Sequence, residues 1–452
     1  MTYQRIEEFY AGRSVLVTGA TGFVGKVLVE KLLYSCQDIA AIYVLVRDKK
    51  DVTAKLRMET IFNLPLFDRL RKSRADAFNK VVCINGDIMK PDLGISAAVS
   101  KDLFQKISVV FHVAASVRFK DNLRSLLESN TFGTQRVIQF CNKIKRLEVF
   151  VYVSTAYSQN QDKVIQEKIY PQQVNIKEIE SIVNQYDENP QMYKDLLNGR
   201  LNTYTLTKAL SENVVAEAFS KNQLPAVIVR PSIIAASYKS PPPGWQDTWG
   251  GATGLIYSLA KGFSHVIYGK GSYIVDLIPV DYVVNAMIVA AARYTKNQRN
   301  PSVYNICTSS GNPLTISDLV RSFGKFARSS RFNELPVGVV ITSCTLLYHL
   351  IRIITELFPS IFIDFWEKAR GRKPWYAQVN QLMGRQREVL NAYSNGSWVM
   401  ETSRTESLAS NLSTEDQEDF EFDPKKIIWD EYIGVYLAGI ERFLLPSVKD
   451  NC

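Results

Sequence analysis

Short runs of apolar residues, many of them β-branched, alternate with longer segments of helical periodicity in the first two thirds of this chain. The apolar runs cover residues 15–18, 42–46, 81–85, 109–113, 149–153 and 226–230. Helical patterns lie between them, most clearly at residues 24–33, 122–143 and 203–220. Near-continuous apolar strands that alternate with helices are typical of a parallel sheet covered on both faces. The pattern therefore predicts an α/β fold, a Rossmann-type doubly wound parallel sheet whose ligands bind at the carboxyl ends of the strands.

The pattern loosens after residue 230. We expect a rigid turn at residues 241–245, a helix that opens at 250–254 and runs through Leu259, and a last strand at 303–306 that returns to the sheet. Two domains follow from this change of character. The first covers residues 10–335, with insertions at about 235–300 that would bind substrate, and a smaller, mainly helical domain covers residues 336–452.

The smaller domain opens with an apolar stretch. Residues 337–351 carry no formal charge, and the apolar pattern continues to Phe365 despite two charged residues and Pro359. A membrane span needs about 20 predominantly apolar residues. This run is shorter and contains several polar residues, so the sequence favours a buried or interfacial helix pair over a span. We also expect this segment, residues 337–365, to bring the protein to a membrane surface.

Two further features precede the C-terminus. A basic turn is expected at residues 371–374, and the acidic residues 415–423 are expected to form a solvated loop and helix start. Asp423-Pro424 has the form of an N-cap followed by a first helical residue, and apolar residues then recur at helical spacing to Leu444.

Length, net charge and composition limit the classes of ligand and partner that the protein is expected to bind. A chain of 452 residues is too long for one ordinary core, and its net charge of +9 suits an anionic membrane surface or polyanionic small molecules. No compact Lys/Arg run with interleaved aromatic residues occurs, so a nucleic-acid partner is not expected. The six cysteines form no CxxC pair and the three histidines have no metal-ligand spacing, which predicts reduced thiols in an intracellular compartment and no metal.

A glycine-rich turn at the end of the first strand has the form of an anion site. Residues 14–26 read SVLVTGATGFVGK, which is a strand, three glycines and the start of a helix. A helix N-terminus leaves its first amides unpaired and carries partial positive charge, so it attracts phosphate. The spacing is GxxGxxG rather than GxGxxG, and the strand-then-helix context makes a dinucleotide the expected ligand. The residues assigned to it are Thr18, Gly19, Thr21, Gly22, Phe23, Val24 and Gly25.

Each glycine of this turn has an expected task. Gly19 allows the chain to turn sharply, and Gly22 allows the backbone to approach a pyrophosphate. Gly25 allows the helix to pack closely on its strand.

The ends of the later strands supply the rest of the expected cofactor site. Arg47 follows the second strand, where an arginine complements a ribose 2′-phosphate and an acid would accept from a 2′-hydroxyl. Asp48 is adjacent, yet the balance favours NADPH over NADH. Asp87 is expected to meet the adenine amine, while Pro231 marks the nicotinamide end or simply ends its strand. The cofactor residues beyond the glycine turn are Arg47, Asp87, Ile88, Ala114, Ala115, Tyr204, Lys208, Arg230, Pro231 and Ile233.

Tyr204 and Lys208 are the expected centre of the chemistry. Their spacing of four residues in a helical pattern puts the phenol and the ammonium on one helix face. A free phenol has a pKa of about 10. A nearby cation and a bound ribose hydroxyl favour the phenolate and poise Tyr204 as a general acid. The same spacing also arises by chance as a surface tyrosine beside a solvated lysine.

Two more polar positions complete the expected catalytic set of Thr155, Tyr204, Lys208 and Asn130. Ser154 and Thr155 end a strand, where a hydroxyl can bond the substrate carbonyl opposite the phenol or can merely cap the next element. Asn130 lies in the middle of a helix, where asparagine has poor propensity. It either extends a proton relay towards Lys208 or is a tolerated surface amide.

With these residues in place, the chain resembles the extended short-chain dehydrogenase/reductases and, more narrowly, the alcohol-forming fatty acyl-CoA reductases. The resemblance covers about residues 10–330 and extends into the C-terminal domain. It rests on TGATGFVG at 18–25, VFHVAASVRF at 110–119, YVSTAYS at 152–158, NTYTLTKALSE at 202–212, VRPSII at 229–234, PPPGWQDTWGGATG at 241–254, LIPVDYVVNAMI at 277–288 and FEFDPKKIIWDEYIGVYLAGIERFLL at 420–445. The glycine motif and YxxxK are shared with many nucleotide-sugar enzymes, whereas the blocks at 241–254 and 420–445 narrow the family.

The resemblance implies a reaction. Thr155, Tyr204 and Lys208 match the family's catalytic set, and Asn130 matches the helix asparagine of the wider superfamily. A long-chain fatty acyl-CoA would be reduced by NADPH to a primary alcohol and CoA in two hydride transfers. Thr155 and Tyr204 would stabilise the oxyanion and Tyr204 would protonate it, with no cysteine nucleophile. Two stretches depart from the family pattern, at Asp48, where proline is frequent, and at residues 399–405.

We also expect an intracellular protein, peripheral to or anchored at the cytosolic face of the endoplasmic reticulum or of peroxisomes. The sequence leaves the oligomeric state open, with a homodimer among the alternatives. Two other interpretations stay open. One is another NAD(P)-dependent enzyme of the extended family, such as a sugar epimerase or a sterol dehydrogenase, with a polar substrate pocket. The other is a non-catalytic nucleotide-binding protein that assembles on a membrane.

Overall fold

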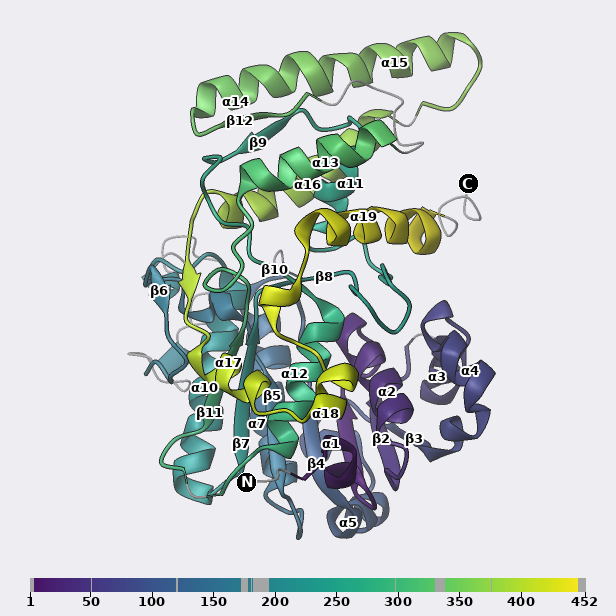
Figure 1. The fold of residues 1–452 in the computed structure, drawn as a ribbon, viewed down its shortest axis with the longest axis vertical. Helices are drawn as coiled ribbons and strands as arrows, with labels where there is room; N and C mark the ends of the chain where they lie inside the picture. The colour runs from purple at the N-terminus through teal and green to yellow at the C-terminus, as the bar shows by residue number, and fades with distance from the viewer. Residues whose placement is uncertain are drawn as a thin grey trace.

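A seven-stranded parallel sheet forms the centre of the protein (Figure 1). The computed structural model describes residues 4–445 except 50, 119–120, 172–177, 180, 182–194, 297, 330–337 and 375. The strand order is β11-β7-β5-β4-β1-β2-β3. The strands are β1 (Ser14–Thr18), β2 (Ala41–Val46), β3 (Val81–Asn85), β4 (Ile107–His112), β5 (Val149–Val153), β7 (Ala226–Pro231) and β11 (Ser302–Ile306). Each strand coincides with an apolar run of the sequence, so the predicted α/β doubly wound fold is confirmed.

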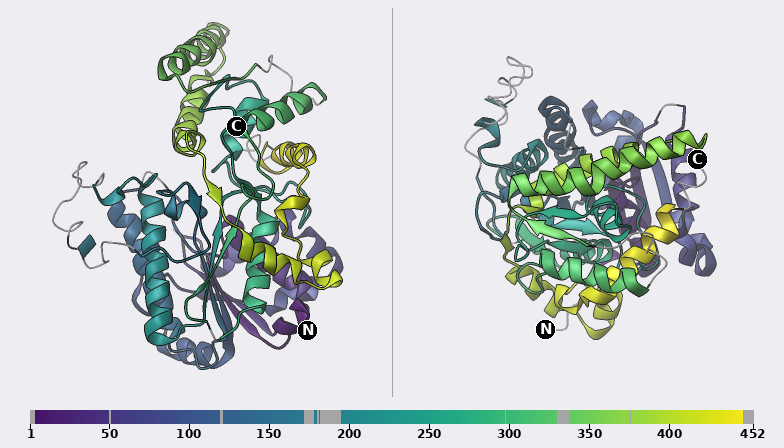
Figure 2. Two further views of the ribbon diagram at one scale, coloured as in Figure 1. Left: turned by 60° about the vertical axis from the view of Figure 1, so that its left-hand side comes forward. Right: turned by 90° about the horizontal axis from the view of Figure 1, so that it is seen from above.

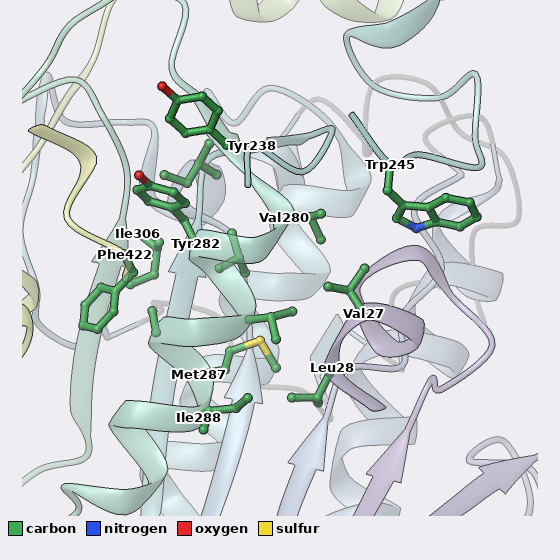
Figure 3. Packing of buried hydrophobic residues seen from close by; sticks show 14 of the residues in the cluster. Val27, Leu28, Tyr238, Trp245, Val280, Tyr282, Met287, Ile288, Ile306 and Phe422 are labelled. Carbon is green, nitrogen blue, oxygen red and sulfur yellow. The ribbon is translucent and has the colours of Figure 1, made fainter. Parts of the chain in front are cut away.

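Alternate residues of the strands face two separate apolar clusters. In β1, Val15 and Val17 belong to the cluster covered by α2 (Phe23–Ser35) and α12 (Val280–Ala292), whereas Leu16 belongs to the cluster on the other face. Figure 3 shows Leu28 of α2 opposite Met287 of α12 within the first cluster. Burial of both faces explains why the strands read as continuous apolar runs rather than as an alternating pattern.

The second face is covered by α5 (Ala97–Lys106), α7 (Gly133–Cys141) and α10 (Thr203–Asn222). The helix predicted at 122–143 is continuous from α6 (Leu123–Leu126) through a π turn, Leu127–Phe132, into α7. The π turn contains Asn130. The remaining helices of this half are α1 (Ile6–Tyr10), α3 (Ala54–Phe62) and α4 (Asp68–Ser73).

The C-terminal third interleaves with the chain before it. Short strands pair in parallel across the two parts: β12 (Val340–Thr342) with β9 (Val266–Tyr268), and β13 (Val399–Met400) with β6 (Val164–Ile165). A third short pair, β8 (Ile233–Ala235) and β10 (Leu277–Pro279), lies in the insertion itself. The predicted boundary at Leu335-Pro336 lies outside the described residues.

Helices of the insertion and of the C-terminal third gather beyond one end of the sheet, while α17 and α18 run back along it (Figures 1 and 2). These helices are α11 (Thr253–Ala260), α13 (Ile316–Ser329), α16 (Tyr376–Ser394), α17 (Ser403–Ser410), α18 (Thr414–Asp419) and α19 (Trp429–Gly439). The predicted helix through Leu259 is confirmed as α11.

The acidic stretch 415–423 is not the solvated loop that the sequence predicts. Most of α18 lies in it, and the carboxylate of Asp416 is buried and accepts a hydrogen bond from the amide of Ile6 at 3.1 Å. Asp423 does cap a turn, as predicted, and its side chain accepts from the amide of Lys425.

The prediction at 337–365 is wrong in two respects, because the segment forms neither a pair of helices nor a buried element, while its interfacial position stays a prediction. α14 (Thr345–Arg352), a π turn (Ile353–Leu357) and α15 (Phe358–Ala369) form one continuous helix of 25 residues. Only 17% of its most apolar stretch of 18 residues is buried. We call it the apolar helix. It lies across the far end of the molecule, where both views of Figure 2 show it on the outside. Pro359 does not break it, because proline is tolerated in the first turn of α15 that follows the π turn.

Two glycines allow α19 to touch the insertion. Gly244 has φ +75°, and a Cβ there would lie 2.5 Å from the carbonyl oxygen of Val435 and 2.8 Å from the Cα of Gly439. A Cβ on Gly439 would in turn lie 2.6 Å from the carbonyl carbon of Gly244. The two backbones are therefore in direct contact, and neither position has room for a side chain.

Substitution of Gly439 by valine is expected to lower the free energy of unfolding by roughly 1–3 kcal/mol, because the added carbons overpack this crossing. Urea unfolding followed by tryptophan fluorescence measures it. Gly384→Ala in α16 is the control, since the nearest atom to a Cβ there is Nη2 of Arg352 at 3.6 Å. Equal stability of Gly439→Val and the parent would contradict the close crossing.

Candidate active site

The glycine turn lies between β1 and α2 and is shaped by close backbone contacts. Gly19 has φ +76°, and a Cβ there would lie 2.6 Å from the amide nitrogen of Ala114. A Cβ on Gly25 would lie 2.8 Å from the Cα of Ala20. No side chain caps α2 at Gly22. The first amides of α2 therefore remain open to an anion, as a pyrophosphate site requires.

A buried histidine joins this turn to the sheet. His112, at the end of β4, bonds Oγ1 of Thr18 through Nδ1 at 2.7 Å and Oγ1 of Thr134 through Nε2 at 2.9 Å. Burial, aided by the charge of Lys208, lowers the pKa of His112 to about 3, so the imidazole is neutral. Sequence reasoning considered the histidines only as metal ligands. The adjacency of β1 and β4 in the expected sheet was the available signal for this contact.

The ribose end of the site carries two arginines. The side chain of Arg47 is 61% exposed and lies 3.7 Å from Asp87. Arg57 of α3, which the sequence analysis missed, donates to the carbonyl of Arg47 and lies 3.4 Å from Oγ1 of Thr21. Asp48 is occupied elsewhere, because its oxygens accept from the Ala54 amide at 2.7 Å and from Asn85 Nδ2 at 2.8 Å. The oxygens of Asp48 are therefore engaged within the protein, while Arg57 and the exposed Arg47, which faces Asp87, present guanidinium groups here.

Lys208 is held at the end of β5. Its Nζ donates to the carbonyl of Val153 at 2.7 Å and to the Tyr152 hydroxyl at 3.3 Å. Burial lowers the pKa of Lys208 to about 7, opposed by the charge of Glu212. Tyr204 lies one turn earlier on α10 and is half-buried. Burial raises the pKa of its phenol, and the nearby phenol of Tyr393 adds to the effect. The group is therefore protonated at neutral pH.

The two hydroxyls that end β5 have different surroundings. Ser154 donates to Oε1 of Glu212 at 2.5 Å and is turned to the interior. Thr155 caps the turn that follows, since its Oγ1 accepts from the Tyr157 amide at 3.4 Å. That bond is long and uses the oxygen only as an acceptor, so the Thr155 hydroxyl keeps its proton for a further partner.

Arg230 was expected beside the nicotinamide, but its guanidinium is fully buried and committed to the protein. It bonds Glu212 through Nε at 2.8 Å and Nη2 at 2.6 Å, and it also donates to the carbonyls of Gln166 and Lys168. Pro231 ends β7 and pairs with Ile306, and Ile233 starts β8, where its amide donates to the carbonyl of Asp276. The Arg230–Glu212 pair therefore fixes α10 against the end of β7.

Asn130 is buried and holds the loop after β4. Its Oδ1 accepts from the Ser116 amide at 2.7 Å, and its Nδ2 donates to Thr207 Oγ1 and to the Ser116 carbonyl, both at 3.1 Å. Its own carbonyl, in the π turn, accepts from the hydroxyls of Ser211 and Thr134. Asn130 thus ties the loop of Ala114 and Ala115 to α10, and its carbonyl lies on the α10 face that carries Lys208.

The remaining predicted residues lie around these. The Ala114 amide donates to Thr18 Oγ1 at 3.3 Å, and Ile88 packs at Gly133, whose added Cβ would lie 3.0 Å from Ile88 Cδ1. Among the residues that the structure describes, no group of three or more His, Cys, Asp or Glu side chains is arranged to hold a metal. The five described cysteines are free thiols.

The C-terminal third also reaches this site, which the sequence did not reveal. Asn202, the N-cap of α10, donates through Nδ2 to the hydroxyl of Tyr393 in α16 at 3.2 Å. The insertion approaches from the other side, where Asp247 forms an ion pair with Lys26 in the first turn of α2. Contacts between residues so distant in the chain follow no spacing rule in the sequence.

The fold resembles reductase and epimerase structures. The terminal R domain from the myxalamid PKS-NRPS biosynthetic pathway superposes with a TM-score of 0.65 at 20% identity, over 95% of this chain and 90% of that one. The UDP-glucuronic acid 4-epimerase of Bacillus cereus, solved in complex with NAD, superposes with a TM-score of 0.57 at 16% identity, over 95% and 99%. At these identities the likeness shows a shared fold and no more.

Sequence comparison is more specific. Residues 17–287 match an NAD-binding family described as male sterility protein, and residues 355–447 match its companion C-terminal family of the same description. The chain is 37% identical to fatty acyl-CoA reductase 1 of Xenopus laevis over 97% of its length and 86% of the relative. It is 36% identical to the human protein of that name and 35% identical to fatty acyl-CoA reductase 2 of Bos taurus, each over 86% of the relative. This chain therefore belongs to the fatty acyl-CoA reductase family of oxidoreductases.

Proposed function

We propose that this protein reduces long-chain fatty acyl-CoA to a primary fatty alcohol and CoA with NADPH, using residues 10–335 as the reductase domain and 336–452 as a C-terminal domain. One observation carries the proposal. Lys208 is bonded to the end of β5, which places the helix face of Tyr204 and Lys208 at the strand end that presents Thr155. The names of the relatives supply the substrate class.

Each residue has a distinct task. Tyr204 is protonated and donates a hydrogen bond to the carbonyl oxygen of the thioester, and Thr155 donates a second. As negative charge develops on that oxygen, the Tyr204 proton passes to it, while the Lys208 ammonium lowers the cost of the phenolate left behind. The hemithioacetal then returns its hydroxyl proton to the Tyr204 phenolate as its C–S bond breaks, which gives the aldehyde and releases CoA as the thiolate. Tyr204 and Thr155 bond the aldehyde oxygen in the same way, a second hydride and the Tyr204 proton convert it to the alcohol, and a solvent proton restores Tyr204. NADPH supplies hydride when bound.

The residues of the cofactor site fit a phosphorylated dinucleotide. The open amides at the start of α2 suit the pyrophosphate, and the guanidinium groups of Arg47 and Arg57 suit a 2′-phosphate. Asp48 does not compete for this position, because its carboxylate is held by Ala54 and Asn85.

Tyr204→Phe is expected to lower kcat by at least about 100-fold, since it removes the general acid and leaves the ring. The assay follows NADPH oxidation with hexadecanoyl-CoA and identifies hexadecanol by mass spectrometry. Binding of NADPH, followed by its fluorescence, is expected to persist. Full turnover by this variant would contradict the assigned acid. Failure of the wild type on acyl-CoAs of all chain lengths, together with reduction of another carbonyl, would contradict the substrate.

Arg47→Ala and Arg57→Ala are each expected to raise KM for NADPH by about tenfold, because each removes a charged hydrogen-bond donor to the 2′-phosphate. KM for NADH is expected to change little. Lys55→Ala, an exposed cation on the same helix as Arg57, is the control. A parallel loss with both cofactors would contradict the 2′-phosphate assignment.

We also propose that the apolar helix rests on a membrane surface, at the cytosolic face of the endoplasmic reticulum or of peroxisomes. Its outer residues are exposed: Leu346, Leu347, Leu350, Ile353, Ile354, Leu357, Phe358, Ile361, Phe362, Phe365 and Trp366. The exposed cations Lys368, Arg370, Arg372 and Lys373 follow at its end and suit anionic lipid. Its inner face is polar, because Glu356 is buried against Arg387, and that pair opposes a membrane-spanning position.

The double variant Phe358→Glu/Phe362→Glu is expected to abolish flotation with phosphatidylserine-containing vesicles, because it places two charges in the lipid-facing stripe. Leu56→Glu/Ile428→Glu, which charges exposed apolar residues elsewhere, is the control and is expected to float like the wild type. Carbonate treatment is expected to release the wild type from membranes. Retention after carbonate would contradict a surface position and indicate a span.

A further inference from the structure

The last turn of α16, in the C-terminal third, contacts the N-terminus of α10, the helix that carries Tyr204 and Lys208. The side chain of Asn202 works in two directions. Its Oδ1 accepts from the Thr205 amide at 2.9 Å and so caps α10, while its Nδ2 donates to the Tyr393 hydroxyl at 3.2 Å. The Thr205 hydroxyl closes the cap from the other side, 3.3 Å from the Asn202 amide. Tyr393 is therefore bonded to the residue that starts the helix of Tyr204.

Tyr393 is itself held by aromatic neighbours. Its ring lies 4.8 Å from that of Tyr157 at an interplanar angle of 85°, and Tyr157 lies edge-on to Trp398 at 5.8 Å. The indole of Trp398 donates to the carbonyl of Asn160 at 2.9 Å. Tyr157 and Asn160 belong to the loop that begins at Thr155. Tyr393 thus lies between the loop of Thr155 and the cap of the helix of Tyr204.

Contacts of the rest of α16 with other elements hold Tyr393 in position. Asp364 of the apolar helix caps α16, since its oxygens accept from the amides of Tyr376 and Ala377 at 2.9 and 2.8 Å. Further along, Arg387 pairs with the buried Glu356 at 2.5 Å. At the far end, Ser394 donates to the carbonyl of Tyr268 at 2.9 Å. α16 is therefore bonded to other elements near its start, in its middle and at its end, next to Tyr393.

We propose that Tyr393 is a positioning residue for the reaction, acting through Asn202 on the first turn of α10 and hence on the phenol of Tyr204. The inference rests on the proposed reductase function. Tyr204 lies two residues past the N-cap, in the turn of a helix that frays most readily. A displacement of about 1 Å in a reacting group costs on the order of 100-fold in rate. The hydrogen bond to Tyr393 that holds this N-cap is therefore expected to affect kcat.

The test compares Tyr393→Phe with Asn202→Ser. The first keeps the ring and removes the hydroxyl, and the second keeps a capping oxygen and removes the amide that reaches Tyr393. Each is expected to lower kcat with hexadecanoyl-CoA by about tenfold and to leave KM for NADPH within about twofold. The double variant is expected to be no slower than either single variant, because both remove one shared bond.

Tyr432→Phe is the matched control. It removes another buried phenol bond of the C-terminal third, from Tyr432 to the carbonyl of Ala236 at 2.7 Å, and is expected to leave kcat unchanged. Three results would overturn the proposal: wild-type kcat in Tyr393→Phe, additive losses in the double variant, or an equal loss of kcat in Tyr432→Phe.

A second readout does not depend on the substrate. Hydrogen exchange of the amides at the start of α10, measured in the cofactor-free protein, is expected to accelerate several-fold in Tyr393→Phe and Asn202→Ser and not in Tyr432→Phe. Unchanged exchange in both variants would overturn the positioning role. Accelerated exchange in a protein without acyl-CoA reductase activity would support the contact and instead contradict the proposed function.

Discussion

The buried ion pair of Glu212 and Arg230 is the constraint on which the catalytic geometry depends. Both side chains are shielded from water, and Glu212 accepts as well from the hydroxyls of Ser154 and Ser158. A buried pair of this kind contributes little net stability, yet removal of one partner leaves an uncompensated charge and costs about 3–5 kcal/mol. The role we assign to the pair is instead to specify how the elements that it joins are arranged. It sets α10, β5 and β7 in one arrangement, and the face of Tyr204 and Lys208 follows from it.

The C-terminal third is part of this arrangement rather than an appendage. α19 meets the insertion through the crossing of Gly244 and Gly439, and the hydroxyls of Tyr436 and Thr253 bond at 2.9 Å beside it. The same insertion carries Asp247 to the first turn of α2. On the opposite side α16 reaches the cap of α10. The cofactor helix and the catalytic helix are thus both supported by residues that come late in the chain.

The sequence was sufficient for what depends on local pattern. Strands buried on both faces read as apolar runs, so the sheet followed from periodicity, and the glycine turn followed from its place between strand and helix. The environments of Arg57 and Arg230 depend on partners in other helices and loops, and no spacing encodes those partners. The contact of His112 with Thr18 could be inferred only from the adjacency of β1 and β4. The apolar helix was mistaken for a helix pair because its uncharged run is shorter than a membrane span and contains polar residues. In the structure a π turn, Ile353–Leu357, joins α14 to α15 in one helix. The roles of Thr155, Tyr204, Lys208 and Asn130 in the reaction, and those of the cofactor residues, stay predictions.

The apolar helix has a consequence for how the protein behaves once it is isolated. Soluble monomers rarely display a contiguous apolar area larger than a few hundred Å². Here eleven large side chains along one helix lie uncovered, from Leu346 to Trp366. In buffer without detergent or lipid, a second molecule can bind to this stripe. The particle size measured by light scattering therefore reports how much of the stripe detergent or lipid covers. Because the contact is apolar, mild detergent or short-chain phospholipid, rather than a change of salt, is the additive expected to keep the isolated protein from associating.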